Sequence, residues 1–461
     1  MTDIEIKLWL EKYGGWILIW ISSFIPVFLW LGINDIGLEF STAYGVFSSL
    51  GEIFGLIGFV LYAINLVLAL RHRWLENFFQ GLNRVYIAHH ITGGFALALL
   101  VFHPFFLAAR SLDFKFMETF GYAARFLWPR AIDTAESYLV VQDAVSINAG
   151  IIAFWGMVVL LILTFFVKLP YRFWLFTHRF LGVAFLFALL HIITISSDTS
   201  RSAAMKWYLI AWGLVGIAAF LYRTVFGNVL VKRYPYKVTK VIVQGPMTMI
   251  ELKPMAKTMQ FKPGQFIFIR FKWSEEKGVI PEAHPFSIAS GPAEDGLRLY
   301  VKALGDFTSS LHGLEDGTIA EIEGAFGRFT PARYGTAPQV WIAGGIGITP
   351  FLSMARSLQQ LPQKVYLVYS VATRSEMVEA SILKDFLPEH YKNFVFIPYI
   401  TDEQDGKFLT ADFVESQVDG GFAGKELFLC GPPPMMKSMR AQIRGKGIPN
   451  RKIHSEEFAM S

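Results

Sequence analysis

Four histidines within long apolar stretches are the residues of this chain best suited to chemistry. His89 and His103 share one stretch, and His178 and His191 share another. An ionisable side chain at bilayer depth is costly and usually marks an ion, proton or electron path. The spacings of fourteen and thirteen residues correspond to roughly 20 Å along a helix at about 1.5 Å per residue. Two such helices could clamp two stacked metal macrocycles and carry electrons through a membrane.

Helix geometry favours His89 over its neighbour His90 as the partner of His103. Fourteen residues at about 100° each place His89 and His103 on one face, whereas His90 is rotated away by about 140°. The spacing of thirteen would splay His178 and His191 on an ideal helix, so we expect a bend or different rotamers there. Hydrogen bonding within the bundle is the alternative role for any single histidine. The matched depths of the two pairs favour metal ligation, and imidazole suits iron.

Two further features lie in the same apolar stretches. Gly93, Gly94 and Gly182 fall between the histidines, where missing side chains would leave room for a flat macrocycle. Such glycines also allow helices to pack closely. Glu52 lies in another apolar stretch and could serve a proton or a metal, or could simply be an interfacial residue.

The composition indicates a membrane half followed by a soluble half. Of 461 residues, 53% are hydrophobic and 16% aromatic, and the mean hydropathy is +0.41, which is high for a soluble protein. The apolar character is dense from Trp16 to about Phe226 and ordinary after Arg233. The net charge of +5 could suggest nucleic-acid binding, but the basic residues cluster beside the apolar runs. The single cysteine, Cys430, excludes covalent haem attachment through Cys-x-x-Cys-His and any four-cysteine cluster, so a haem here is non-covalent.

We expect six membrane spans and a cytoplasmic soluble half. One set of connections carries Lys and Arg more densely than the other and should be cytoplasmic, because basic residues favour that side. Both termini are then inside, the loop 110–146 faces out, and the compartment is a plasma (inner) membrane. The expected spans are about 16–33, 46–70, 85–109, 147–167, 174–195 and 206–225.

The expected pattern of secondary structure in the soluble half changes near residue 338. Short strands separated by turn residues predict a small antiparallel β-barrel over 234–337. Alternating strands and helices predict an α/β domain with a parallel sheet over 338–461, with nucleotide at the carboxyl ends of the strands. The membrane part is then 1–233. The expected strands are 236–243, 247–252, 266–271, 297–303, 319–323, 339–343, 365–370, 394–400, 426–430 and 452–456.

A glycine-rich turn follows the first strand of the expected α/β domain and opens a helix. Glycines let backbone amides approach a pyrophosphate, and a helix N-terminus favours its negative charge. The turn does not match Gly-x-Gly-x-x-Gly, so the ordinary Rossmann fingerprint is not met. Its residues are Gly344, Gly345, Ile346, Gly347, Ile348, Thr349 and Pro350.

Several motifs of the soluble half resemble, in order, those of the ferric reductase and NADPH oxidase family. The segment 284–290 resembles its flavin-binding motif in the His-Pro-Phe form, and 261–266 resembles the Pro-Gly-Gln strand before it. Residues 301–308 and 324–327 resemble the flavin pyrophosphate segment and its neighbour. The turn 344–350 resembles the pyridine-nucleotide loop, and 430–433 the nicotinamide-side motif. Residues 456–458 resemble the C-terminal segment whose aromatic covers the flavin ring. The membrane half resembles the family's six-span haem domain, with the four histidines at its ligand positions.

The resemblance implies an all-α six-helix haem bundle, an FAD-binding β-barrel and an α/β domain for NAD(P)H. Ser287 can hydrogen-bond flavin N5 and Phe286 can pack on the nucleotide portion, although Phe286 could instead be barrel core. Arg374 could pair with a 2′-phosphate and favour NADPH over NADH, or be solvated surface. Phe458 is the implied catalytic aromatic. The flavin residues are His284, Pro285, Phe286, Ser287, Gly305, Thr308, Gly324 and Gly327. The nucleotide residues are Gly344, Gly345, Gly347, Thr349, Pro350, Arg374, Cys430, Gly431 and Pro432.

The expected activity is electron transfer from cytoplasmic NAD(P)H through FAD and two b-type haems to an external acceptor. Flavin is required because hydride carries two electrons and haem accepts one. Dioxygen, giving superoxide, and ferric iron, giving ferrous iron, both fit as acceptors, and a quinone or a protein remains open. The alternative is a haem-free, membrane-anchored flavin reductase that serves a cytoplasmic acceptor.

Overall fold

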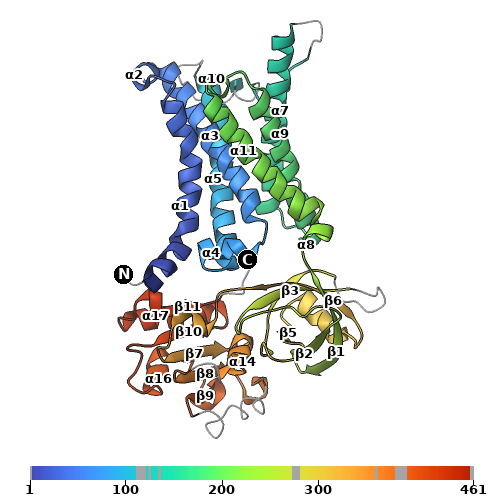
Figure 1. Cartoon of the computed structure of the whole chain (residues 1–461), viewed down its shortest axis with the longest axis vertical. Helices are drawn as coiled ribbons and strands as arrows, with labels where there is room; N and C mark the ends of the chain where they lie inside the picture. Colours follow the sequence, from blue (N-terminus) through green and yellow to red (C-terminus); the bar gives the residue numbers. More distant parts are fainter. Residues whose placement is uncertain are drawn as a thin grey trace. The chain divides into compact units, whose positions relative to one another are not determined.

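The structure, a computed structural model, describes residues 3–110, 121–122, 126–132, 137–272, 281–358, 362–378 and 392–456. The chain divides into two compact units, Met1–Val231 and Lys232–Ser461. The first unit is helical, and the second contains both β-sheets of the described residues (Figure 1).

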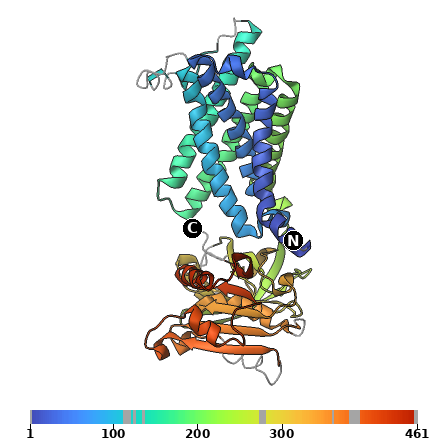
Figure 2. The same ribbon diagram turned by 90° about the vertical axis from the view of Figure 1, so that its left-hand side faces the viewer.

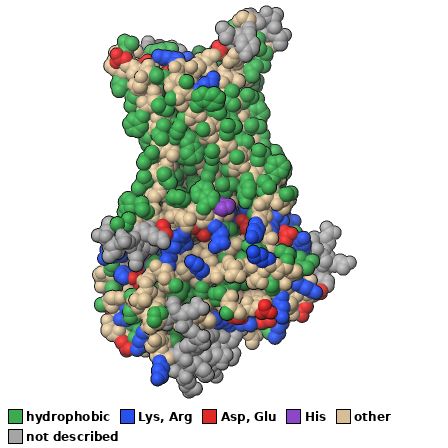
Figure 3. All heavy atoms as spheres, viewed as in Figure 1, with side chains coloured by type: hydrophobic (Ala, Val, Ile, Leu, Met, Phe, Trp, Pro, Cys, Tyr) green, Lys and Arg blue, Asp and Glu red, His purple; other side chains and the backbone are tan. Residues whose placement is uncertain are grey.

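Six helical stretches among the described residues are long and apolar enough to cross a membrane, as expected. Each begins before the apolar run that predicted it, because the helices continue beyond the hydrocarbon-length segment into polar residues. Hydrophobic side chains cover the visible surface of this unit (Figure 3). The stretches are Trp9–Leu31, Ala43–Leu68, Leu82–Ala109, Val140–Phe165, Tyr171–Thr194 and Ala203–Val225.

The long helices are tightly packed, with α3 the most buried of them. Antiparallel neighbours α3 and α5 approach closely where α3 has glycine. A Cβ at Gly58 would stand 2.8 Å from Leu100, and one at Gly51 would stand 2.8 Å from Leu107. Both ribbon views show these helices side by side (Figures 1 and 2). The helices are α1 (Asp3–Leu31), α2 (Ile36–Glu39), α3 (Ala43–Leu68), α4 (Glu76–Phe79), α5 (Leu82–Ala109), α7 (Tyr138–Phe165), α8 (Tyr171–Arg179), α9 (Leu181–Thr194), α10 (Asp198–Arg201), α11 (Ala203–Phe220) and α12 (Gly227–Leu230).

The first part of the second unit is a curled antiparallel sheet. Its strand order is β4-β3-β6-β1-β2-β5, and a hydrogen bond from Ala289 N to Arg298 O (2.9 Å) joins the chain just after β4 to β5. Alternating residues such as Tyr236, Val238 and Ile250 form its buried core. The strands are β1 (Tyr234–Gln244), β2 (Met247–Pro254), β3 (Phe266–Phe271), β4 (His284–Ser287), β5 (Leu297–Lys302) and β6 (Ile319–Phe326). The short helix α13 (Asp306–Ser310) lies between β5 and β6 in the chain.

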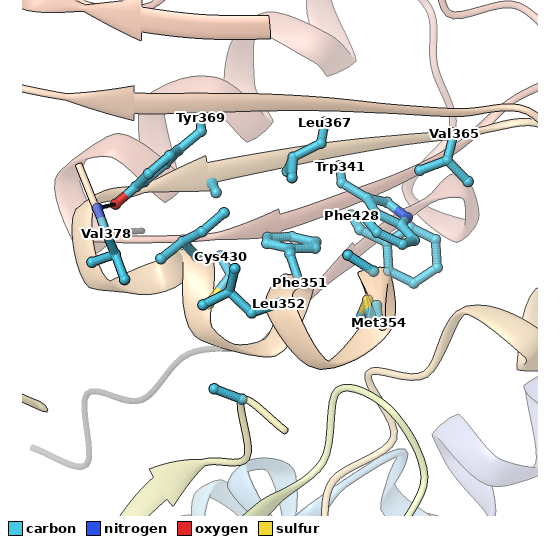
Figure 4. Close-up of a cluster of buried hydrophobic side chains, with 14 of the residues drawn as sticks. Trp341, Phe351, Leu352, Met354, Val365, Leu367, Tyr369, Val378, Phe428 and Cys430 are labelled. Atoms are coloured by element: carbon cyan, nitrogen blue, oxygen red, sulfur yellow. Dashed lines mark hydrogen bonds between the residues drawn. The ribbon is translucent and has the colours of Figure 1, made fainter. Parts of the chain in front are cut away.

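The second part is a five-stranded parallel sheet, as predicted. Its order is β11-β10-β7-β8-β9. Figure 4 shows Phe351 and Leu352 of α14 pointing toward Trp341 and Cys430 of the sheet, and Phe351 stacks on Trp341 with centroids 5.7 Å apart. The elements are β7 (Gln339–Gly344), α14 (Thr349–Ala355), β8 (Val365–Val371), β9 (Phe394–Ile400), α16 (Ala411–Ser416), β10 (Glu426–Cys430), α17 (Pro433–Gly445) and β11 (Ile453–Ser455).

One strand was missed by the sequence reasoning. Residues His284–Ser287 form β4, which pairs only with β3 at the edge of the sheet. A four-residue strand with a proline gives no periodic signal, and proline is tolerated at an edge because its missing N–H faces away from the ladder.

Candidate functional sites

His89 and His178, which the expected topology places near the cytoplasmic face and which we call the inner pair, lie close together in the helical bundle. The ring centroids of His89 (α5) and His178 (α8) lie 6.1 Å apart with an interplanar angle of 66°. His89 Nδ1 lies 3.1 Å from the backbone oxygen of Asn65 on α3. His178 Nδ1 lies 3.3 Å from the hydroxyl oxygen of Thr164 on α7. His90 is exposed, and its ring centroid lies 5.8 Å from that of His89.

His103 and His191, which the expected topology places near the outer face and which we call the outer pair, each lie close to a backbone oxygen of another helix. His103 Nδ1 lies 2.7 Å from the Gly51 oxygen of α3, and His191 Nδ1 lies 2.9 Å from the Ser146 oxygen of α7. Each histidine therefore takes its orientation from a neighbouring helix rather than from its own.

The helix that carries His178 and His191 is broken between them. Helix α8 ends at Arg179, α9 begins at Leu181, and Phe180 lies at the junction with φ −68° and ψ −12°. The break removes the assumption of one straight helix, under which a spacing of thirteen would have splayed the two rings. A bend at this junction and different rotamers are the two explanations that the sequence analysis offered for the spacing.

The four imidazoles would suit two haems, each held by two of them. A hydrogen bond at Nδ1 fixes the tautomer and leaves Nε2 to face a metal. A metal–nitrogen bond of about 2.0 Å on each side would separate two ring centroids by roughly 6 Å, close to the 6.1 Å between His89 and His178. Among the described residues, three or more His, Cys, Asp and Glu side chains nowhere gather as metal ligands, so paired ligation is the arrangement offered.

The intervening glycines differ from one another. A Cβ at Gly182 would stand 2.1 Å from Phe220, and one at Gly93 would stand 2.6 Å from the Asn65 side-chain nitrogen. These two glycines therefore serve contacts between helices rather than open space, and the expectation of room for a macrocycle is wrong for them. A Cβ at Gly94 would have no heavy atom within 4 Å.

Glu52 belongs to a polar network that joins several helices. Its Oε2 accepts a hydrogen bond from Trp30 Nε1 at 2.9 Å. Asp198 of α10 interacts with Glu52 and accepts from Asn34 (2.8 Å) and Arg201 (2.7 Å). Burial opposes ionisation of Asp198, but the hydrogen bonds from Asn34, Arg201 and Glu52 lower its pKa. The described residues of this network do not form a metal cluster.

The flavin-type motif occupies the edge strand β4. The His284 ring stacks on Phe307 of α13 with centroids 3.7 Å apart, and its Nε2 lies 3.2 Å from Glu282. Burial lowers the pKa of His284, although Glu282 opposes the shift. Phe286 packs against the core of the curled sheet. Ser287 is buried opposite Phe266 of β3.

The remaining flavin-type residues lie in or beside α13 and β6. The Thr308 hydroxyl oxygen accepts from the backbone N–H groups of Leu304 (2.9 Å) and Gly305 (3.0 Å), so it caps α13 from within. Gly324 and Gly327 have φ of +150° and +98°, values that favour glycine. The carbonyl of Gly327 accepts from Gln265 Nε2 at 2.9 Å, and this anchor was not predicted.

The structure brings the two nucleotide-type motifs together at the carboxyl ends of β7 and β10. A Cβ at Gly347 would stand 2.4 Å from the Cys430 oxygen, and one at Gly431 would stand 3.1 Å from Gly344 Cα. At Gly344 the crowding comes from side chains instead: a Cβ there would stand 2.3 Å from Met435 Sδ. At Gly347 and Gly431 it comes from backbone. Backbone therefore approaches backbone here, which only glycine permits. Gly345 has φ +51°, and Thr349 and Pro350 begin α14.

Cys430 is buried at the end of β10. Burial raises the pKa of its thiol well above the ordinary value, and the charge of Glu456 adds to the effect. Glu456 is itself buried, and its Oε1 would lie 2.7 Å from a Cβ at Gly327. Glu456 thus joins the flavin-type and nucleotide-type segments, and sequence reasoning missed it although it lies in the quoted C-terminal motif. Phe458 lies outside the described residues.

Arg374 is exposed and already paired. Its Nε and Nη2 donate to the two carboxylate oxygens of Glu403 at 2.8 and 2.7 Å. This hydrogen bonding raises the pKa of Arg374. A 2′-phosphate would have to compete with Glu403 for the same guanidinium edge.

Comparison with known proteins matches one family within the helical unit and two within the unit that contains the β-sheets. The family "Ferric reductase like transmembrane component" matches residues 54–189, "FAD-binding domain" matches 233–318, and "Oxidoreductase NAD-binding domain" matches 341–441. The chain is therefore a membrane-embedded oxidoreductase with FAD- and NAD(P)H-binding domains. It has the architecture of the ferric reductase and NADPH oxidase family.

Individual relatives resemble only part of the chain. The reductase component of propane 2-monooxygenase from Mycolicibacterium goodii is 26% identical over 48% of this chain and 67% of its own length. A flavohemoprotein from Rhodopirellula baltica is 30% identical over 43% and 53%. The chain thus spans about half to two thirds of the length of these relatives. A solved flavohemoglobin from Malassezia yamatoensis aligns with a TM-score of 0.46 and 20% identity, over 71% of this chain and 90% of that one, a similarity too distant to inform function.

Proposed function

We propose that this protein moves electrons from cytoplasmic NAD(P)H through FAD and two b-type haems to an acceptor on the other side of the membrane. The observation that carries the proposal is the set of four imidazoles, each oriented by a hydrogen bond at Nδ1. Hydrogen bonding inside the bundle without a metal would not require the His89 and His178 rings to lie with their centroids 6.1 Å apart and an interplanar angle of 66°.

The chain's own residues would bind and orient the cofactors. His89 and His178 would hold the inner haem and His103 and His191 the outer haem, each ligand kept in one tautomer by its Nδ1 partner. Bound haem supplies one-electron exchange, and bound FAD converts the two-electron hydride into single electrons. No side chain is required as a nucleophile or a general base.

The soluble unit would hold both nucleotides. We assign FAD to 234–337, through β4 and the glycines Gly305, Gly324 and Gly327, and NAD(P)H to 338–461. The close backbone approach of the turn 344–350 to 430–432 supports a surface without side chains for the nucleotide. The buried Cys430 thiol would remain protonated and add no charge beside the nicotinamide. Phe458 would cover the flavin ring. The membrane part is then 1–233.

The denser Lys and Arg on one set of connections supports a plasma (inner) membrane orientation with both termini cytoplasmic. The acceptor would be dioxygen or a ferric chelate at the outer end. Of the charged outer-loop residues, Arg110, Arg130 and Asp143 are described, whereas Asp113, Lys115, Glu118, Arg125, Asp133 and Glu136 lie outside the described residues.

The test is the visible spectrum and haem content of the purified full chain, oxidised and then reduced with NADPH. We expect two b-type haems in the wild type, one in His89→Leu and one in His103→Leu. His90→Leu is the matched control and should retain both. Reduction of ferricyanide by NADPH monitors the flavin unit in every variant. FAD without any haem, in protein supplied with haem, would overturn the proposal in favour of the anchored flavin reductase.

A further inference from the structure

Several backbone carbonyls of the membrane helices accept a hydrogen bond from a side chain of a neighbouring helix. Those of Leu181, which accepts from Tyr62 Oη (2.7 Å), and Asn65, which accepts from His89 Nδ1 (3.1 Å), lie near a helix end. Three others lie well inside their helices. In each case the donor nitrogen comes from a histidine ring proposed to bind metal or from the side chain beside one. The three are Gly51 from His103 Nδ1 (2.7 Å), Ser146 from His191 Nδ1 (2.9 Å) and His89 from Asn65 Nδ2 (2.8 Å).

The residue four positions after each accepting carbonyl is glycine. Gly55 follows Gly51, Gly150 follows Ser146, and Gly93 follows His89. In an α-helix the carbonyl of residue i already accepts from the N–H of residue i+4. Because Cβ atoms tilt toward the helix N-terminus, the Cβ of residue i+4 flanks that oxygen. Glycine at this position therefore uncovers the oxygen for a lateral donor.

The distances show that the missing Cβ is what admits the donor. An added Cβ would stand 2.7 Å from His103 Nδ1 at Gly55 and 3.0 Å from His191 Nδ1 at Gly150. At Gly93 it would stand 2.6 Å from Asn65 Nδ2. In all three cases the nearest atom is the donor nitrogen itself.

Other glycines of the bundle do not share this property. The nearest atom to an added Cβ is a carbon of Leu100 at Gly58 (2.8 Å) and a carbon of Leu189 at Gly213 (2.3 Å). These glycines allow apolar packing alone. The carbonyl of Asn65, which accepts from His89 at 3.1 Å, is followed four residues later by Ala69 at the end of α3, so a helix end can uncover a carbonyl without glycine.

We propose that Gly55, Gly93 and Gly150, which we call the glycine notches, are positioning residues for the haem ligands. Gly55 and Gly150 leave room for the two outer imidazoles to reach helix carbonyls. Gly93 leaves room for the Asn65 amide to reach the backbone oxygen of His89. This inference rests on the proposed function, since it assumes that the histidines bind haem. It assigns the two outer ligands to carbonyls uncovered by glycine, and it leaves the inner ligands His89 and His178 to the Asn65 backbone oxygen and the Thr164 hydroxyl.

The consequence is that the two haems should respond to different glycines. An alanine at Gly55 or Gly150 must push the imidazole away from its acceptor, which weakens the bond that fixes its tautomer. Losing such a supporting contact typically costs about 10- to 100-fold in metal affinity.

The experiment compares Gly55→Ala, Gly150→Ala and Gly93→Ala with Gly58→Ala in the full-length purified protein. Gly58 is the matched control, because its Cβ would be equally crowded, but by leucine. The readouts are haem per protein, the low-spin ferric EPR signals, and FAD content as a measure of folding. Gly150→Ala has the widest of the three spacings and keeps the test open if Gly55→Ala is not produced.

We expect Gly55→Ala and Gly150→Ala to shift or remove the same EPR signal and Gly93→Ala to affect the other. Gly58→Ala should lower thermal stability while both signals remain. Unchanged signals in Gly55→Ala and Gly150→Ala, or equal haem loss in Gly58→Ala, would overturn the glycine notches alone. A wild type without haem signals would instead overturn the proposed function, and this inference with it.

Discussion

The Asn65 side chain offers the sharpest test of how the inner haem level is held. Its Nδ2 donates to the His89 backbone oxygen at 2.8 Å and to the Thr92 hydroxyl at 3.3 Å. Asn65→Leu removes both donors and keeps the backbone oxygen that accepts from His89 Nδ1. The change leaves neither acceptor without a partner. The backbone oxygen of His89 lies inside α5, where it accepts an intrahelical hydrogen bond, and the Thr92 hydroxyl still donates to Ala88 O.

The expected loss of haem affinity follows from these two hydrogen bonds. A hydrogen bond contributes about 0.5–1.5 kcal/mol net, so two contribute about 1–3 kcal/mol. At about 1.4 kcal/mol per factor of ten, the inner haem should bind roughly 5- to 150-fold more weakly if the loss falls on the haem-bound state. This range includes the roughly 10- to 100-fold effect that is typical of contacts supporting a metal ligand.

The assay is the transfer of haem from the purified protein to excess apomyoglobin, followed by absorbance, with EPR to show which haem leaves. Asn148→Leu is the matched control. The Asn148 amide also makes two hydrogen bonds, to the Arg130 backbone at 2.7 and 2.8 Å, but contacts no proposed ligand in the described residues. Asn65→Leu protein that retains both haems as the wild type does, with an unchanged inner signal, would refute the reasoning.

Two further predictions concern the soluble unit. Cys430 is the single cysteine, and because burial and then the charge of Glu456 raise its thiol pKa, the reactive thiolate should stay scarce up to about pH 9. Maleimide should therefore label folded protein at least about tenfold more slowly than denatured protein, and rapid labelling of folded protein would contradict the burial. Glu403→Gln should release Arg374 and raise the ratio of kcat/KM for NADPH over NADH, by at most about fivefold because exposed ion pairs are weak. Arg374→Ala should lower the same ratio, and an unchanged ratio in both variants would show that Arg374 does not read the 2′-phosphate.

Much of the architecture could be predicted because its signals are local in the sequence. The six spans follow from runs of apolar residues, and the parallel sheet follows from strands that alternate with helices. The spacing of fourteen residues places His89 and His103 on one face of α5 by helix geometry alone. Edge strand β4 escaped prediction because four residues with a proline carry no periodicity.

The contacts that orient the site required the tertiary structure. The partners of His89, His103 and His191 lie 24, 52 and 45 residues away in sequence, on helices whose rotation no sequence pattern states. The pairing of Arg374 with Glu403, which is 29 residues away, likewise depends on a neighbour distant along the chain.

The sequence by itself determined which residues could bind redox cofactors, because composition, helical spacing and motif order can all be read along the linear chain. Only the tertiary structure decided how those residues are held. A glycine such as Gly93 can leave room for a ligand or admit a donor from another helix. The choice depends on which atom stands opposite the missing Cβ, here Asn65 Nδ2.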